Sequence, residues 1–103
     1  MTEFAPERVA ASVGRALWGE VPPRLRSVRF KASGRDIVLR FTYEGDPTDD
    51  EREAMSVVGA EVAADFPDAS ITEEAITIAS ESEVAYAEGW QTAYARKEPS
   101  LAR

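Results

Sequence analysis

The stretch from Val28 to Phe41, VRFKASGRDIVLRF, decides the fold because apolar and polar residues alternate on both sides of a turn. The turn runs from Ser33 to Asp36, and Gly34 within it is typical of a tight hairpin loop. With a two-residue loop at Gly34-Arg35, the predicted pairs are Ala32 with Ile37, Phe30 with Leu39, Val28 with Phe41 and Arg26 with Tyr43. This register puts nearly all large apolar residues on one face, and a slip by one residue would lose that agreement. The sequence therefore predicts an antiparallel hairpin of two strands, residues 25–32 and 37–43.

Two amphipathic helices are predicted on either side of the hairpin. The first runs from Pro6, which suits an opening helical turn, to Trp18, where a glycine and two prolines follow. The second begins at Thr48, which is followed three residues later by Glu51 in the pattern of a capping box, and ends at Phe66. Their apolar stripes are Val9, Val13, Ala16 and Leu17 in the first helix, and Met55, Val58, Val62 and Phe66 in the second.

A third strand is predicted over residues 70–79, with Ile76 and Ile78 pointing inward. Ile71 is out of phase with that pair, so we expect a bulge or a late strand start near residues 73–74.

The C-terminal part of the sequence is less regular. Residues 80–89 are polar and predict a loop, residues 90–97 alternate weakly and predict a fourth strand at an edge, and residues 99–103 should fray. The order is then α-β-β-α-β, with a further β at the end. We therefore expect one small α+β domain over residues 1–103, in which both helices pack on one face of a mainly antiparallel sheet.

The chain contains neither cysteine nor histidine among its 103 residues. These two absences exclude disulfides, thiol nucleophiles, imidazole catalysis and zinc sites built on His or Cys. Serines have no histidine to activate them, and no glycine-rich phosphate loop occurs, so we expect no enzymatic activity and no cofactor. The acidic run from Asp46 to Glu53 lacks the spacing and central glycine of a calcium loop. It is interpreted as carboxylates at a helix N-terminus, and no metal is expected.

The net charge of -7 is divided unevenly along the chain. Residues 1–45 carry a net charge of +3, residues 46–88 of -12 and residues 89–103 of +2. The acidic balance argues against general nucleic-acid binding, which needs a basic footprint on the phosphates. No apolar run approaches the roughly 20 residues that cross a bilayer, and the N-terminus lacks a signal-peptide pattern, so we expect no membrane partner and a cytoplasmic location.

The outer face of the hairpin predicts a cluster of positive charge. Arg29 lies opposite Arg40 in the predicted register, and like charges in that position are unfavourable unless they are compensated. The favoured interpretation places Glu73 of the third strand between them, in a surface ion-pair network. The alternative is a surface that binds an anion or a partner, made of Arg24, Arg26, Arg29, Lys31 and Arg40.

Several aromatic residues are candidate interface anchors, because Trp and Tyr are favoured at protein interfaces. They are Trp18, Tyr86, Trp90 and Tyr94. Small domains also use aromatic residues to close the ends of the core. We expect that role for Trp18, whereas Trp90 and Tyr94 are compatible with either role.

Three segments of the sequence resemble a family of small bacterial proteins of about this length, mostly without an assigned activity. They are ALWGEVPPRLRSV (residues 16–28), LRFTYEG (39–45) and EVAADFPD (61–68). The resemblance covers residues 15–80 and consists of helix ends, a strand and a turn rather than catalytic groups. It implies the same α-β-β-α-β order. Some relatives look like immunity proteins encoded near secreted toxins, which implies a toxin partner and transfers no catalytic residue.

The leading hypothesis is a non-enzymatic protein-binding domain of the immunity type, whose acidic stretch masks a basic toxin surface such as that of a nuclease. The candidate contact residues are Asp49, Asp50, Glu53, Glu61, Glu73 and Glu74. One alternative is a homo-oligomeric or interaction module that pairs through a sheet edge or the outer face of the hairpin. A second alternative is a small-anion binder that uses Arg29, Lys31 and Arg40.

Overall fold

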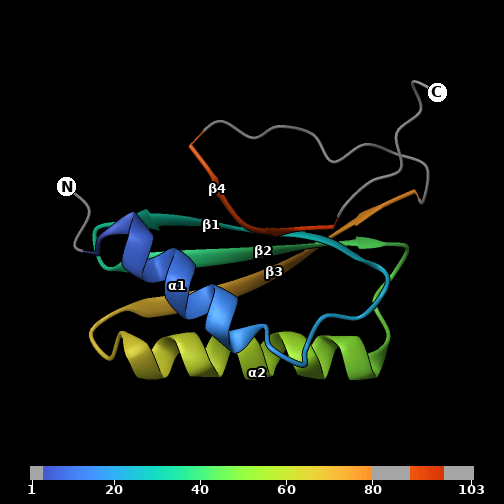
Figure 1. Cartoon of the computed structure of the whole chain (residues 1–103), viewed down its shortest axis with the longest axis horizontal. Coiled ribbons are helices and arrows are strands. Elements are labelled where there is room, and N and C mark those ends of the chain that lie inside the picture. The colour runs from blue at the N-terminus through green and yellow to red at the C-terminus, as the bar shows by residue number, and fades with distance from the viewer. Residues whose placement is uncertain (1–3, 80–88, 97–103) are drawn as a thin grey trace.

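The computed structural model describes residues 4–79 and 89–96, and within these ranges it contains two helices and one four-stranded sheet (Figure 1). In chain order the elements are α1 (Pro6–Ala16), β1 (Leu25–Ser33), β2 (Asp36–Glu44), α2 (Asp49–Asp65), β3 (Ser70–Ile78) and β4 (Gln91–Ala95). The sheet order is β3-β2-β1-β4, in which β1 pairs antiparallel with β2 and β4, and β2 pairs parallel with β3. The predicted α+β class and order of elements are therefore confirmed, and the sheet is mixed.

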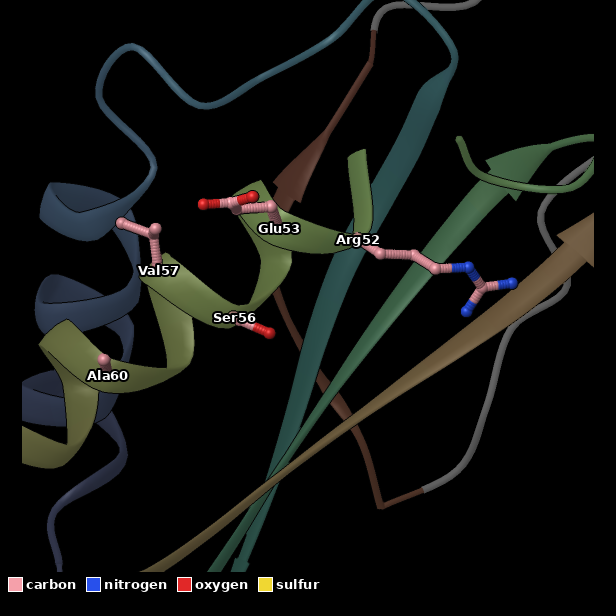
Figure 2. Close-up of a pocket in the computed structure, with 5 residues that line it drawn as sticks. All are labelled: Arg52, Glu53, Ser56, Val57 and Ala60. Carbon is pink, nitrogen blue, oxygen red and sulfur yellow. The ribbon is translucent and has the colours of Figure 1, made fainter. Parts of the chain in front are cut away.

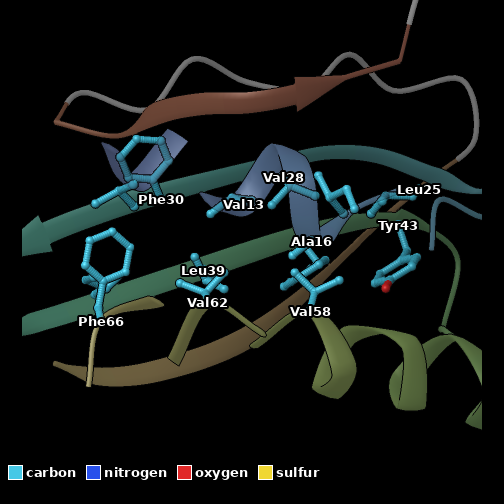
Figure 3. Packing of buried hydrophobic residues seen from close by; sticks show 14 residues of the cluster. Val13, Ala16, Leu25, Val28, Phe30, Leu39, Tyr43, Val58, Val62 and Phe66 are labelled. Carbon is cyan, nitrogen blue, oxygen red and sulfur yellow. The ribbon is translucent and has the colours of Figure 1, made fainter. Parts of the chain in front are cut away.

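The core lies between the two helices and one face of the sheet (Figure 3). Each helix supplies its predicted apolar stripe, and β1 and β2 supply the inward side of the hairpin. The buried cluster consists of Val9, Val13, Ala16, Leu17, Leu25, Val28, Phe30, Ile37, Leu39, Phe41, Tyr43, Val58, Val62 and Phe66. Burial of these side chains removes apolar surface from water and is the main favourable contribution to folding.

The hairpin register is confirmed over most of its length. The pairs of Ala32 with Ile37, Phe30 with Leu39 and Val28 with Phe41 all form, as does the pair of Arg29 with Arg40. The pair predicted for Arg26 and Tyr43 is wrong, because a bulge between Leu25 and Ser27 places Leu25 opposite Tyr43. The bulge turns the Leu25 side chain into the core, where it is fully buried. In the regular register Leu25 would lie on the outer face of the hairpin, and this apolar burial would be lost.

The residues of strand β3 that face the core are not the ones that were predicted. Its register with β2 is uninterrupted along its whole length, so the predicted bulge is wrong. Ile71 lies beside Ile37 and packs with Ala75 against the core, whereas Ile76 and Ile78 lie on the opposite phase and face away from the helices. The physical reason is that apolar residues occupy both phases of this strand, so alternation alone does not select the inward one.

The helix ends follow the predicted local signals closely. Helix α1 ends at Ala16, two residues earlier than predicted, and Leu17 is its C-cap residue. At the start of α2 the predicted capping box is present. The Thr48 hydroxyl accepts from the Glu51 backbone N–H at 3.1 Å, and the Glu51 carboxylate accepts from the Thr48 backbone N–H at 2.8 Å. Both interactions satisfy donors that a helix start otherwise leaves without partners.

The predicted fourth strand is present as β4, and it extends the sheet next to β1. Of the loop predicted for residues 80–89, residues 80–88 lie outside the described residues, as does the frayed tail predicted for residues 99–103. Within the described ranges, neither helix has the length and apolar character that crossing a membrane would require.

Candidate partner-binding surface

The outer side of α2 carries a group of exposed carboxylates. Because Val58 and Val62 face the core, positions on the other side of the helix point to solvent. Four of the six predicted contact residues lie there and are exposed. They are Asp49, Asp50, Glu53 and Glu61. Arg52 is the sole basic residue of the helix, so the outer side of α2 is strongly negative.

The other two carboxylates at the ends of α2 have internal partners. Glu51 accepts a hydrogen bond from Arg24 at 2.7 Å, and this bond holds the pKa of Glu51 below its usual value. Asp65 accepts from Ser12 at 2.6 Å and from Arg15 at 2.5 Å, and the Ser12 bond contributes most to lowering its pKa. These two residues therefore attach α2 to the rest of the fold. Within the described residues, the four outer carboxylates have no such contacts and are available to a partner.

The same side of α2 contains an open depression of about 470 Å³ (Figure 2). It is lined by Arg52, Glu53, Ser56, Val57 and Ala60. Its shallow form suits contact with a protein surface more than enclosure of a small ligand, which is normally largely buried by its pocket. Across residues 4–79 and 89–96, no group of three or more metal-ligating side chains is placed to hold an ion.

Glu73, the fifth predicted contact residue, lies between the sheet and α2 rather than on the outer surface. It is on the inward phase of β3, and its side chain approaches the backbone of Gly59 so closely that a Cβ there would lie 2.0 Å from Glu73 Oε2. Partial burial raises the pKa of Glu73 above its ordinary value. The expectation that Glu73 sits between Arg29 and Arg40 is therefore wrong, because those arginines lie on the other face of the sheet.

Glu74, the sixth predicted residue, takes the role that was expected of its neighbour. It lies beside Arg40 in the parallel register, and Arg40 Nε donates to Glu74 Oε1 at 2.5 Å. The Arg40 guanidinium also stacks on the Trp90 ring at 4.0 Å, and Lys31 Nζ lies 5.9 Å from that ring. The Arg40 guanidinium, part of the predicted anion site, thus already contacts the Glu74 carboxylate and the Trp90 ring. Arg29, another residue of that predicted site, also has an interaction partner.

Arg24 and Arg26 are used at one end of the sheet. Arg24 donates to the carbonyl oxygens of Glu44 at 2.7 Å and Asp46 at 2.8 Å, in addition to its bond with Glu51. Arg26 is buried and pairs with the Glu44 carboxylate at 3.5 Å, which also accepts from Arg96. These contacts join β1 to the turn after β2, so both arginines have a structural role here.

The aromatic residues differ in exposure. Tyr94 packs partly buried against the core, Trp90 stacks on Arg40, and Tyr86 lies outside the described residues. The expected role of Trp18 in closing the core is wrong, because its surface is 84% exposed. A signal was present in the sequence: Leu17 continues the buried stripe of α1, and the next residue along a helix points roughly 100° away from it.

Comparisons with known proteins support one family assignment. No curated protein matches the chain. A family model described as the MafI2 immunity protein matches residues 6–98, which include every element of the structure. The chain therefore belongs to the MafI2 immunity protein family.

Proposed function

We propose that this protein is a non-enzymatic inhibitor that binds a toxin and masks it by docking the acidic outer side of α2 on a basic toxin surface. The observation that carries the proposal is the group of four exposed carboxylates on one helix, with no internal cation within the described residues. Membership of an immunity protein family supports a toxin as the partner.

The charge on α2 suits rapid recognition of a basic protein. Complementary potentials steer two proteins together and raise association rates by about 10- to 1,000-fold over an uncharged pair, with strong dependence on salt. A toxin that acts on a nucleic acid needs a basic substrate-binding surface, and an acidic helix seated there would exclude the phosphates. Masking of this kind needs neither a cofactor nor a covalent step.

The test uses, as the partner, a toxin whose gene is found next to the gene for this chain. The double variant Glu53→Gln/Glu61→Gln removes two outer carboxylates of α2. The matched control Glu7→Gln/Asp36→Asn removes two exposed carboxylates elsewhere and changes the net charge equally. Stopped-flow association is measured at low and physiological salt, together with inhibition of toxin activity.

We expect the α2 variant to associate at least about tenfold more slowly at low salt, with a weaker salt dependence, while the control stays near the wild-type rate. Equal slowing by both variants would mean that net charge rather than the α2 surface matters. A toxin that neither binds the wild-type chain nor is inhibited by it would contradict the proposed function itself.

A further inference from the structure

Trp18 stands out among the described residues as a large apolar side chain held in solvent. It is 84% exposed, whereas Leu17 beside it is buried in the core. Its backbone is well held, because the Trp18 N–H donates to the Arg15 carbonyl at 3.2 Å and the Glu20 N–H donates to the Leu17 carbonyl at 2.9 Å. The fold thus presents this indole on an ordered turn that would need little rearrangement to bind a partner.

The ion pairs at the two ends of α2 place this turn beside the acidic helix. Arg15, at the end of α1, bonds Asp65 in the last turn of α2. Arg24, at the far end of the α1–β1 segment, bonds Glu51 in the first turn of α2. These two attachment points lie about 21 Å apart along the helix at 1.5 Å per residue. Residues 16–23 connect these two attachment points, and Figure 1 shows the segment leaving α1 next to α2 and then turning toward β1.

This arrangement brings apolar and acidic side chains together on one side of the molecule. Val21 lies on the same segment as Trp18 and is 40% exposed, and Val57 lies on the outer side of α2 and is 38% exposed. Figure 2 shows Val57 pointing from α2 toward the α1 side, whereas Arg52 points away from it over the sheet. Glu53 and Glu61 come from the same stretch of α2 as Val57. Trp18, Val21 and Val57 thus give this side of the molecule exposed apolar surface, and α2 gives it exposed carboxylates.

We propose that Trp18 is the anchor residue of the toxin-binding surface and inserts into an apolar pocket of the toxin that is bordered by Lys and Arg side chains. The inference rests on the proposed function and specifies its contact site. Tryptophan is among the residues most enriched at the energetic centres of interfaces, and a surrounding ring of polar contacts keeps water from such a centre. Here the carboxylates of α2 would form that ring and meet the basic border of the pocket.

Charge complementarity favours a basic partner over a second copy of this chain. In a symmetric dimer the same side of the molecule would face itself, so the exposed carboxylates of α2 would meet equal charges across the interface. Juxtaposed like charges suppress such pairing, whereas a basic protein neutralises them. The toxin is thus the occupant that the patch fits.

The test combines binding measurements with a signal from each tryptophan. The chain holds two tryptophans, so incorporation of 5-fluorotryptophan gives two ¹⁹F resonances, and Trp90→Phe assigns them. Unlabelled toxin from the same locus is titrated into the labelled chain. Trp90, stacked on Arg40 across the sheet, serves as the internal control. Affinity is measured for the wild type and for Trp18→Ala, and the melting temperature confirms that the variant is folded.

We expect Trp18→Ala to weaken toxin binding by about 30-fold or more, since central anchors contribute at least this much. The Trp18 resonance should shift and lose contact with solvent on binding, and the Trp90 resonance should stay in place. If the wild type binds but Trp18→Ala binds within about threefold of it, the inference is overturned while the proposed function stands. If the toxin does not bind the wild type, the proposed function fails. If Trp18→Ala instead dissolves a dimer of this chain, the occupant is a second copy and the inference is wrong.

Discussion

The contact between Gly59 and Glu73 allows a quantitative test of how α2 is seated on the sheet. Gly59 is buried in the middle of α2, and a Cβ there would lie 2.0 Å from Oε2, 2.4 Å from Cδ and 2.9 Å from Cγ of Glu73. All three distances are shorter than the roughly 3.5–4.0 Å of an ordinary carbon contact. The substitution Gly59→Ala therefore requires the Glu73 side chain to leave its place between helix and sheet.

Two opposing effects decide the stability of Gly59→Ala. Alanine stabilises a helix interior by about 1 kcal/mol relative to glycine. Displacement of Glu73 removes the packing of its methylene groups, and contacting residues commonly couple by about 0.5–3 kcal/mol. We therefore expect Gly59→Ala to gain less stability in the wild type than in a chain that lacks the Glu73 side chain. In the Glu73→Ala background it should gain about 1 kcal/mol, or about 4–8 °C in melting temperature.

The assay is a double-mutant cycle, with free energies of unfolding from urea titrations followed by circular dichroism. Gly14→Ala is the matched control, because Gly14 is also helical but a Cβ there would meet nothing within 4 Å. Its gain should be the same with and without Glu73. If Gly59→Ala stabilises both backgrounds equally, within about 0.3 kcal/mol, the close contact does not exist and the reasoning is refuted.

Three further predictions concern the ends of the sheet and of α2. The hydrogen bond from Arg24 lowers the pKa of Glu51 in the folded chain, so the contact stabilises the fold at pH values above the unfolded pKa of Glu51 and is lost as the pH falls through its folded pKa. Glu51→Gln should therefore lower the melting temperature at neutral pH but not in acid. An equal decrease in melting temperature at both pH values would contradict this prediction. Burial raises the pKa of Tyr43 to about 12. The free energy of unfolding should therefore decrease as the pH rises above about 10, the pKa of tyrosine in the unfolded chain. The tyrosinate absorbance of the folded chain should show one tyrosine that ionises at higher pH than the others. If all tyrosines ionise together near pH 10, the Tyr43 phenol is solvated and the prediction is wrong. Thr48→Ala should lower the free energy of unfolding, measured by urea titration, by about 1 kcal/mol, whereas Thr48→Ser should stay close to the wild type. If Thr48→Ala has the wild-type stability, the capping box contributes nothing.

Local signals were sufficient to predict most of the fold. The alternation around Gly34 predicted the hairpin register, and the capping box at Thr48 predicted the start of α2, because both depend on neighbouring residues. Strand β3 has isoleucines on both of its phases, and its inward phase is determined by the parallel pairing with β2 that only the tertiary fold provides. The bulge that buries Leu25 likewise depends on the space available in the core.

The residues of the candidate surface that lie on α2 were predicted correctly as a group, whereas those on β3 and at the end of α1 were not. Asp49, Asp50, Glu53 and Glu61 could be placed together because they share one helix with a clear buried stripe. The assignment of Glu73 and Glu74 depended on the phase of β3, so a one-residue error exchanged their faces. The exposure of Trp18 could have been predicted from the buried stripe of α1, because Leu17 continues that stripe and the next residue points away from it.

The position of β4 has a consequence for the order in which the sheet is completed during folding. Val28 pairs with Tyr94, so β1 is covered by a strand that comes from far along the chain, whereas the hairpin and β3 come from one continuous stretch. Because the entropic cost of closing a loop rises with its length, we expect β4 to be the last strand to join the sheet. Until it does, β1 presents unpaired backbone N–H and C=O groups at an open edge, where strands of other molecules can add. Once β4 has joined, the backbone of β1 is paired on both sides, and the strands at the two edges of the sheet are β3 and β4.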